Sequence, residues 1–178
     1  AAKAVAEIRA LTDRVYAGEI TGNPAFDALG LLLTEVDIPQ PVIDDIIAGF
    51  ELDAQEWRPR SEHDMLQYCY HVAGAVGVAM ALVMGVSPRD ETTLDRAADL
   101  GLAFQLAKIA RDVAEDAAAD RCYLPVEWLV EMDIPPGQHM HPAFRPRLAV
   151  MGKWLAEMAE EYEASARWGA RKLPPRAR

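Results

Sequence analysis

The chain has 178 residues, about half of them hydrophobic, which is enough for one domain with a sizeable core. Eighteen basic and 28 acidic residues give a net charge of −10, which excludes a protein whose affinity depends on neutralising nucleic-acid phosphates. The two cysteines, Cys69 and Cys122, stand in the apolar or helical contexts of free buried thiols, so we expect a cytoplasmic protein. The weakly polar run 72–86 falls short of the ~20 residues of a membrane span, so we expect no transmembrane helix.

Helical periodicity dominates the chain, and no β-branched runs of period two indicate strands. Prolines, glycines and capping residues predict helices at about 1–17, 24–36, 41–58, 61–85, 92–117, a short one from 125, and 143–170. We therefore predict a single all-α domain over residues 1–178, without repeats or linkers.

Residues 68–80 read YCYHVAGAVGVAM and are apolar on nearly all sides, which predicts a helix buried in the middle of a bundle. Glycine costs about 1 kcal/mol relative to alanine inside a helix, so Gly74 and Gly77 need a compensating reason. One reason is close packing of a neighbouring helix against a ridge formed by Ala73 and Gly77. The other is a groove for a long apolar ligand, and the composition leaves both open.

The next long helix carries a polar stripe, because Gln105, Lys108, Asp112 and Asp116 follow one another at steps of three and four residues. Two like charges one turn apart repel each other, so we expect a cation beside them. A solvated surface face would explain the stripe. A magnesium and diphosphate site would also explain it, because Mg²⁺ is typically held by one or two carboxylates together with phosphate oxygens.

These two segments resemble the squalene/phytoene synthase family. The first signature is Tyr68-Cys69 followed by VAG at 72–74, VG at 76–77 and Met80; the second is LG at 100–101, Gln105, RD at 111–112, Asp116, Arg121, Tyr123 and Pro125. The wording YCYHVAGAVG and DRCYLP is most similar to bacterial phytoene synthases.

The resemblance implies an isoprenoid-synthase-type helical bundle that acts on prenyl diphosphates. The implied reaction is the head-to-head condensation of two geranylgeranyl diphosphates to phytoene, through a cyclopropyl diphosphate and without nicotinamide. Two alternatives stay open. One is a squalene or dehydrosqualene synthase that uses farnesyl diphosphate, and the other is a non-catalytic helical paralogue that serves as a partner subunit.

The resemblance also implies roles for single residues. Asp112 and Asp116 would bind Mg²⁺ or Mn²⁺, and Tyr68 and Arg111 would be catalytic, although a structural hydrogen bond explains Tyr68 equally well. Arg111 points about 100° away from the acidic pair on a helix, so we expect it to orient a neighbouring carboxylate or loop and not to contact the same metal. The residues implied to bind substrate are Val72, Ala73, Val76, Gly77, Gln105, Lys108 and Arg121. Arg121 would either reach a phosphate or anchor its loop.

The sequence departs from the family pattern at Lys108, where the family has asparagine. This lysine would either contact diphosphate as a point charge, or pair with Asp112 and displace the metal. The family also has an earlier aspartate-rich motif and further C-terminal helices. We therefore expect the chain to be a central fragment of the bundle, incomplete at both ends, with half of the metal site and no activity by itself.

Two features outside the signatures lead to weaker expectations. The aromatic residues of the last helix, Trp154, Tyr162 and Trp168, suit a peripheral contact with a membrane, and they suit equally well a face covered by a further helix of the full-length protein. The loop histidines His139 and His141 have no third metal ligand nearby and are interpreted as incidental. Nothing in the sequence indicates an oligomeric state.

Overall fold

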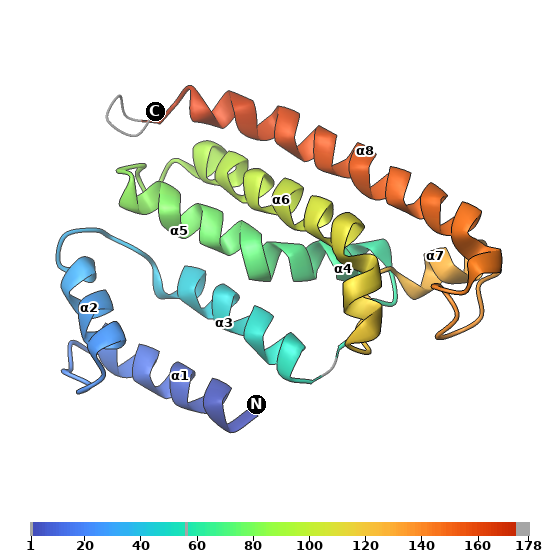
Figure 1. Ribbon diagram of the computed structural model, residues 1–178. Coiled ribbons are helices and arrows are strands. Elements are labelled where there is room, and N and C mark those ends of the chain that lie inside the picture. The colour runs from blue at the N-terminus through green and yellow to red at the C-terminus, as the bar shows by residue number, and fades with distance from the viewer. Residues whose placement is uncertain (1, 56, 174–178) are drawn as a thin grey trace.

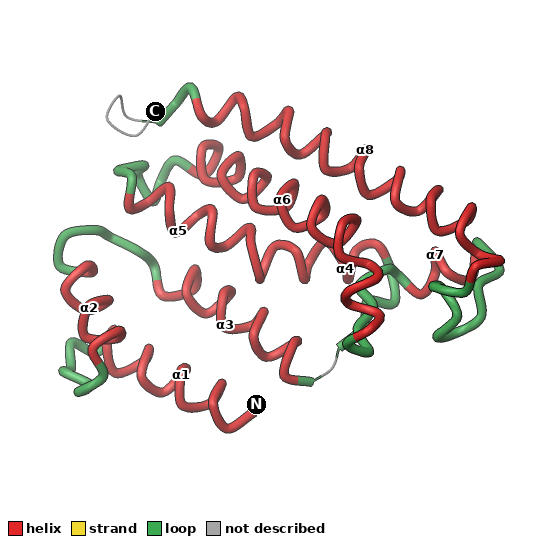
Figure 2. The backbone as a smooth tube through the Cα atoms, in the orientation of Figure 1, coloured by secondary structure: helices red, strands yellow, loops and turns green. Residues whose placement is uncertain are grey.

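The computed structural model describes residues 2–55 and 57–173, and this part of the chain is helical throughout, without strands (Figure 1, Figure 2). The elements are α1 (Ala2–Tyr16), α2 (Pro24–Leu33), α3 (Gln40–Ala54), α4 (Glu62–Cys69), the π-helix η1 (Tyr70–Gly74), α5 (Ala75–Val83), α6 (Glu91–Ala118), α7 (Val126–Glu131), the 3₁₀ turn η2 (Pro142–Phe144) and α8 (Arg145–Ala170). The predicted all-α class is confirmed.

The helices begin where the sequence signals predict and end earlier than predicted in two cases. Ser61 caps α4, because its hydroxyl accepts a hydrogen bond from the Asp64 N–H at 3.1 Å. The second predicted helix ends at Leu33 instead of 36, and the third ends at Ala54 instead of 58. Proline disfavours helical backbone in the residue before it, so Pro59 explains only why the helix does not include residue 58 as predicted.

The central helix of the bundle is α6 (Figure 1). It packs along α8 on one side and along the continuous helix α4–η1–α5 on the other, while α3 covers the far side of that helix and α1 lies beyond α3. The main core lies between α4, α6 and α8. Its fully buried side chains include Met65, Cys69, Leu106, Met151 and Leu155.

The helix over residues 62–83 is interrupted by one π turn at η1. The Ala75 N–H donates to the carbonyl of Tyr70, five residues earlier, and such π turns are frequent at functional sites. By length and composition this 22-residue helix is a candidate membrane span within the described residues, so the expectation that no segment is long enough was wrong. This helix packs between α3 and α6, so its apolar sides are those of a core helix.

Two glycines bring α6 into backbone contact with α5 and with η1. A Cβ on Gly77 would lie 2.3 Å from the carbonyl oxygen of Ala97, and a Cβ on Gly101 would lie 2.3 Å from that of Ala73. Backbone atoms of two packed helices cannot yield as a flexible side chain does, so any larger residue would push the helices apart. Close helix packing is therefore a sufficient reason for Gly77.

Candidate active site

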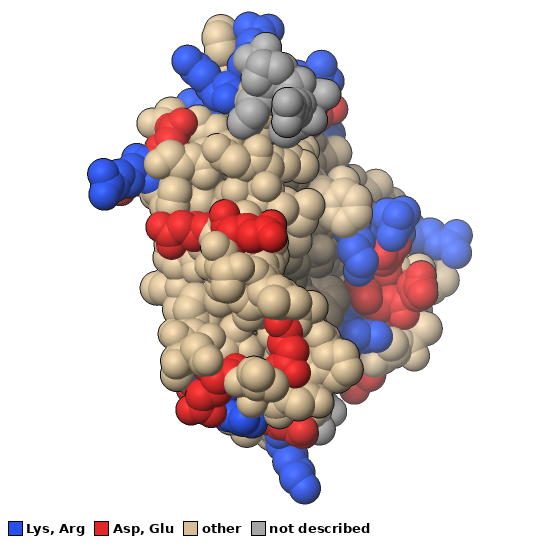
Figure 3. Space-filling view, turned by 90° about the vertical axis from the view of Figure 1, so that its left-hand side faces the viewer, with Lys and Arg blue, Asp and Glu red and all other residues tan. Residues whose placement is uncertain are grey.

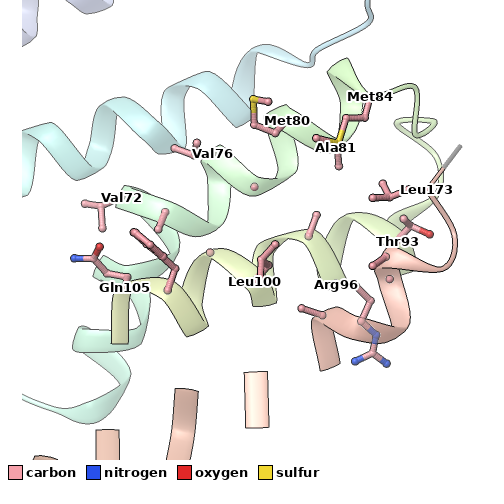
Figure 4. Close-up of a pocket in the computed structure, with 18 residues that line it drawn as sticks. Val72, Val76, Met80, Ala81, Met84, Thr93, Arg96, Leu100, Gln105 and Leu173 are labelled. Carbon is pink, nitrogen blue, oxygen red and sulfur yellow. The ribbon is translucent and has the colours of Figure 1, made fainter. Parts of the chain in front are cut away.

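A cavity of about 580 Å³ opens between α5, α6 and the C-terminal end of α8 (Figure 4). Val72 and Gln105 stand at one end of this cavity, and Met84, Thr93 and Leu173 stand at the other. Five of the residues predicted to bind substrate line it: Val72, Ala73, Val76, Gly77 and Gln105. Both explanations for the glycines of residues 68–80 therefore apply: the helix packs closely on α6, and it also borders an apolar groove.

The cavity wall is almost entirely apolar. Its one cationic residue, Arg96, turns its guanidinium away from the cavity (Figure 4), where it donates a hydrogen bond to the hydroxyl of Ser165. Ser165 in turn donates to the carboxylate of Asp99, so the charge of Arg96 is compensated outside the cavity. A hollow with apolar walls suits a hydrocarbon chain.

Apolar side chains also reach the surface near the cavity. Leu100 and Phe104, on the face of α6 that lines it, are 58% and 69% exposed. Seen from the end where α5 finishes and α6 begins, the surface is mostly uncharged and carries its acidic residues in separate clusters around a recess (Figure 3). Despite the net charge of −10, much of the surface at this end of the bundle thus carries no charged side chain.

Of the two predicted metal ligands, Asp112 has its negative charge more fully balanced by neighbouring cations. Its carboxylate accepts hydrogen bonds from Arg111 Nε at 2.5 Å and Nη2 at 2.9 Å, and Lys108 Nζ lies 3.5 Å away. The hydrogen bonds from Arg111, with a smaller contribution from the charge of Lys108, lower the pKa of Asp112. Its side chain is 13% exposed, so the stripe does not point freely into solvent at this position.

Asp116, one turn further along, has the opposite electrostatic balance. Burial raises its pKa, and the charges of Lys108 and Arg121 only partly offset this. No group of three or more His, Cys, Asp or Glu side chains that would hold a metal exists within residues 2–55 and 57–173. The acidic pair would thus need further ligands such as waters or phosphate oxygens, which fits the oxygen donors that Mg²⁺ prefers.

The two acids lie on the same face of α6 as Gln105, beyond the residues that line the cavity. Asp112 follows Gln105 by seven residues, which places it on the same helix face about 10 Å further on. Lys108 lies between them and is 42% exposed on its side chain. A ligand with an apolar chain in the cavity and a charged head beyond Gln105 would therefore reach the acidic pair.

Tyr68, predicted to be catalytic, is 4% exposed and is not among the residues that line the apolar cavity. Its ring is stacked between Trp57 and Tyr123, with centroid distances of 5.4 and 5.0 Å, and its hydroxyl donates to Asp53 at 2.9 Å. Tyr123 donates to the same oxygen at 3.4 Å. Sequence reasoning missed Asp53, because nothing local distinguishes it from the other acidic residues.

Arg121 lies beyond the C-terminal end of α6, where its backbone N–H donates to the carbonyl of Asp116 at 2.8 Å. Its side chain lines a polar recess of about 230 Å³ that also contains Asp53, Arg58 and Tyr123. Loop anchoring is carried by Arg58 instead, whose guanidinium donates to the carbonyl and the carboxylate of Asp120, both at 3.0 Å. Contact between Arg121 and a phosphate stays a prediction.

A helical bundle with an apolar cavity that ends near two carboxylates is the arrangement of isoprenoid-synthase-type proteins. The chain belongs to the squalene/phytoene synthase family, whose sequence profile matches residues 1–178. The family resemblance of the two signatures is therefore confirmed.

Relatives with curated functions include bacterial phytoene synthases. The phytoene synthase of Pseudescherichia vulneris is 45% identical over 177 residues, which cover 99% of this chain and 56% of that protein. The 15-cis-phytoene synthase of Enterobacter agglomerans is 48% identical over 155 residues, 87% of this chain and 52% of that protein. The chain thus spans about half the length of the curated relatives it matches.

A solved structure supports the fold. A dehydrosqualene synthase crystallised with a ligand superposes with a TM-score of 0.87 over 98% of this chain and 61% of its own, at 24% sequence identity. This similarity shows that the two proteins share the fold.

Proposed function

We propose that this chain belongs to a phytoene synthase, a prenyltransferase that joins two geranylgeranyl diphosphates head to head. The observation that carries the proposal is the apolar cavity that ends at Gln105, with Asp112 and Asp116 following on the same face of α6. The identity of 45–48% to two bacterial phytoene synthases supports the choice of reaction and product.

In this proposal the cavity holds the prenyl chain and keeps water away from the cationic carbons that form when diphosphate leaves. Asp112 and Asp116 hold Mg²⁺ or Mn²⁺, which supplies the positive charge that stabilises the departing diphosphate. Arg111 fixes the orientation of the Asp112 carboxylate through its two hydrogen bonds. The amide of Gln105 stands where the apolar chain would meet its charged head.

One observation favours a second candidate, a helical partner subunit without activity. Lys108 Nζ lies 3.5 Å from Asp112 and so occupies a position beside the carboxylate that a metal would need. A family member in which this pairing persists would bind diphosphate and metal weakly.

Product analysis tests the reaction. The full-length protein with Mg²⁺ and geranylgeranyl diphosphate is expected to release phytoene in the absence of NADPH, and Asp112→Ala is expected to abolish the product. Glu115→Ala, at an exposed position of the same helix, is the matched control and should keep activity. A product seen only with NADPH, or preferred turnover of farnesyl diphosphate in competition, would contradict the proposal.

Metal titration separates the enzyme from the subunit. In an enzyme, Asp112→Ala or Asp116→Ala removes Mg²⁺ binding that depends on pyrophosphate. In a non-catalytic subunit neither substitution changes it.

We also propose a cytoplasmic protein that touches a membrane surface peripherally. Trp168, 66% exposed near the end of α8, supports this contact. Sedimentation with phosphatidylglycerol vesicles should decrease in Trp168→Ala, and equal sedimentation of both forms would contradict the contact.

A further inference from the structure

His139, in the loop between α7 and η2, is buried in a way that the sequence does not predict. The residue is 8% exposed, and its Nε2 has no hydrogen-bond partner among the residues that the structure describes. A buried polar atom without a partner costs about 1–3 kcal/mol, so its position needs an explanation.

The loop does not need His139 to reach its place. Ile134 is 4% exposed, and its N–H donates to the carbonyl of Leu129 at 2.9 Å. Arg147 of α8 donates to the carbonyls of Met132 and Asp133 at 2.7 and 3.0 Å. These contacts hold the loop against the bundle, so the burial of the imidazole is not explained by loop anchoring.

His139 shares a small cavity with Asp116, Arg121 and Cys122. The cavity measures about 10 Å³, close to the space that a single water molecule occupies. A buried water needs two to four polar partners, and His139 and Asp116 are two polar residues of this wall. The other side chains around the cavity are largely apolar: Ile109, Val113, Tyr123 and Leu124.

We propose that His139 is a positioning residue for Asp116 and acts through one buried water. The neutral imidazole donates its Nε2–H to this water, and the water donates to the Asp116 carboxylate. The carboxylate is thereby kept charged and in one orientation. The group that does this comes from a loop outside α6. The inference rests on the proposed function, in which Asp116 is a metal ligand, because outer hydrogen bonds of this kind orient metal-binding side chains.

The test measures Mn²⁺ affinity by electron paramagnetic resonance in the presence of inorganic pyrophosphate, with the full-length protein. His139→Leu is expected to weaken Mn²⁺ binding about tenfold, the lower end of the effect of such outer contacts. His139→Gln, whose amide N–H replaces the donor, is expected to recover most of the affinity. His141→Leu changes the exposed histidine of the same loop and should bind Mn²⁺ as the unsubstituted protein does.

Asp116→Ala separates the two proposals. If Asp116→Ala keeps its Mn²⁺ affinity, the proposed function fails and the inference about His139 fails with it. If Asp116→Ala loses affinity while His139→Leu keeps it, only the inference about His139 is overturned.

A second measurement uses the unsubstituted protein, so it does not depend on whether a variant folds. A high-resolution crystal structure of the unsubstituted protein is expected to show one ordered water within about 3.2 Å of both His139 Nε2 and an Asp116 oxygen. A cavity without that water overturns the proposal.

Discussion

The two halves of α6 contact their surroundings by different physical means. In the first half, Gly101 touches the backbone of the preceding helix and its neighbours wall the apolar cavity. In the second half, the acidic side chains interact with charged neighbours. Arg111 donates a hydrogen bond to Asp112, and Lys108 lies close to the same carboxylate. Steric contact at backbone distance tolerates almost no change, whereas an ionic contact at the surface can be exchanged for water or metal.

The largest effect is expected from filling the backbone contact. Gly101→Ala would place a Cβ 2.3 Å from the Ala73 carbonyl oxygen, so the unfolding free energy should fall by about 1–3 kcal/mol or more. Gly152→Ala, inside α8 with nothing within 4 Å, is the matched control and should gain up to about 1 kcal/mol. Urea denaturation measures both. Equal gains would mean that the helices do not approach as closely as described.

The second-largest effect is expected from filling the apolar cavity at a position outside the backbone contact between the helices. Val76 lines the cavity and is 40% exposed, so Val76→Trp should fill cavity space and leave stability within about 0.5 kcal/mol. We expect the affinity for an apolar fluorescent dye to fall about tenfold, or ~1.4 kcal/mol. Val130→Trp, at a 68% exposed position of α7 outside the cavity, should not change it. Unchanged dye binding in Val76→Trp would place the apolar binding surface elsewhere.

A smaller effect is expected in the charged half. Lys108→Asn removes the cation 3.5 Å from Asp112, and because exposed ion pairs contribute about 0.2–1 kcal/mol, Mg²⁺ affinity should rise by a factor of about 1.4 to 5. Isothermal titration with inorganic pyrophosphate measures this. Weaker binding of pyrophosphate in the variant would show instead that Lys108 contacts the diphosphate itself.

The smallest effect separates the two acids. In metal-free protein, Asp112 should ionise at a lower pH than an ordinary aspartate and Asp116 at a higher pH, which ¹³C NMR of the carboxylates measures. Asp112 therefore stabilises the fold above its unfolded pKa, and this contribution is lost as the pH falls through its folded pKa. Asp116 stabilises the fold at low pH, and this contribution is lost as the pH rises through its folded pKa. Arg111→Gln should raise the pKa of Asp112 and leave that of Asp116 nearly unchanged. Identical titration of both acids in the unsubstituted protein would contradict the assignment.

Much of the fold follows from local rules. Ser61 caps its helix as predicted, and the apolar residues around Val72 lie in the middle of the bundle. The π turn at η1 was not predictable from periodicity, and it lies where α3 packs closely against the helix. A Cβ on Gly49 would lie 2.8 Å from Val72 Cγ1 and 3.3 Å from the backbone of His71.

The candidate site was predictable where residues share one helix. Spacing alone puts Asp112 and Asp116 on a common face. Arg111 leaves the helix about 100° away from them and reaches Asp112 through its long side chain. Tyr68 shows the limit of this reasoning. Its position in a signature suggested chemistry, but a stack with Trp57 and Tyr123, which come from other segments, encloses it.

The sequence by itself determined the helical class, the family and the stripe of polar residues on α6, because helix periodicity and motif spacing are local properties of the chain. Tertiary structure decided that Asp53 holds the hydroxyls of two tyrosines and that His139 is buried beside Asp116. It also decided the width of the apolar cavity. These properties depend on contacts between segments that are tens of residues apart, and only the packing of whole helices brings such segments together.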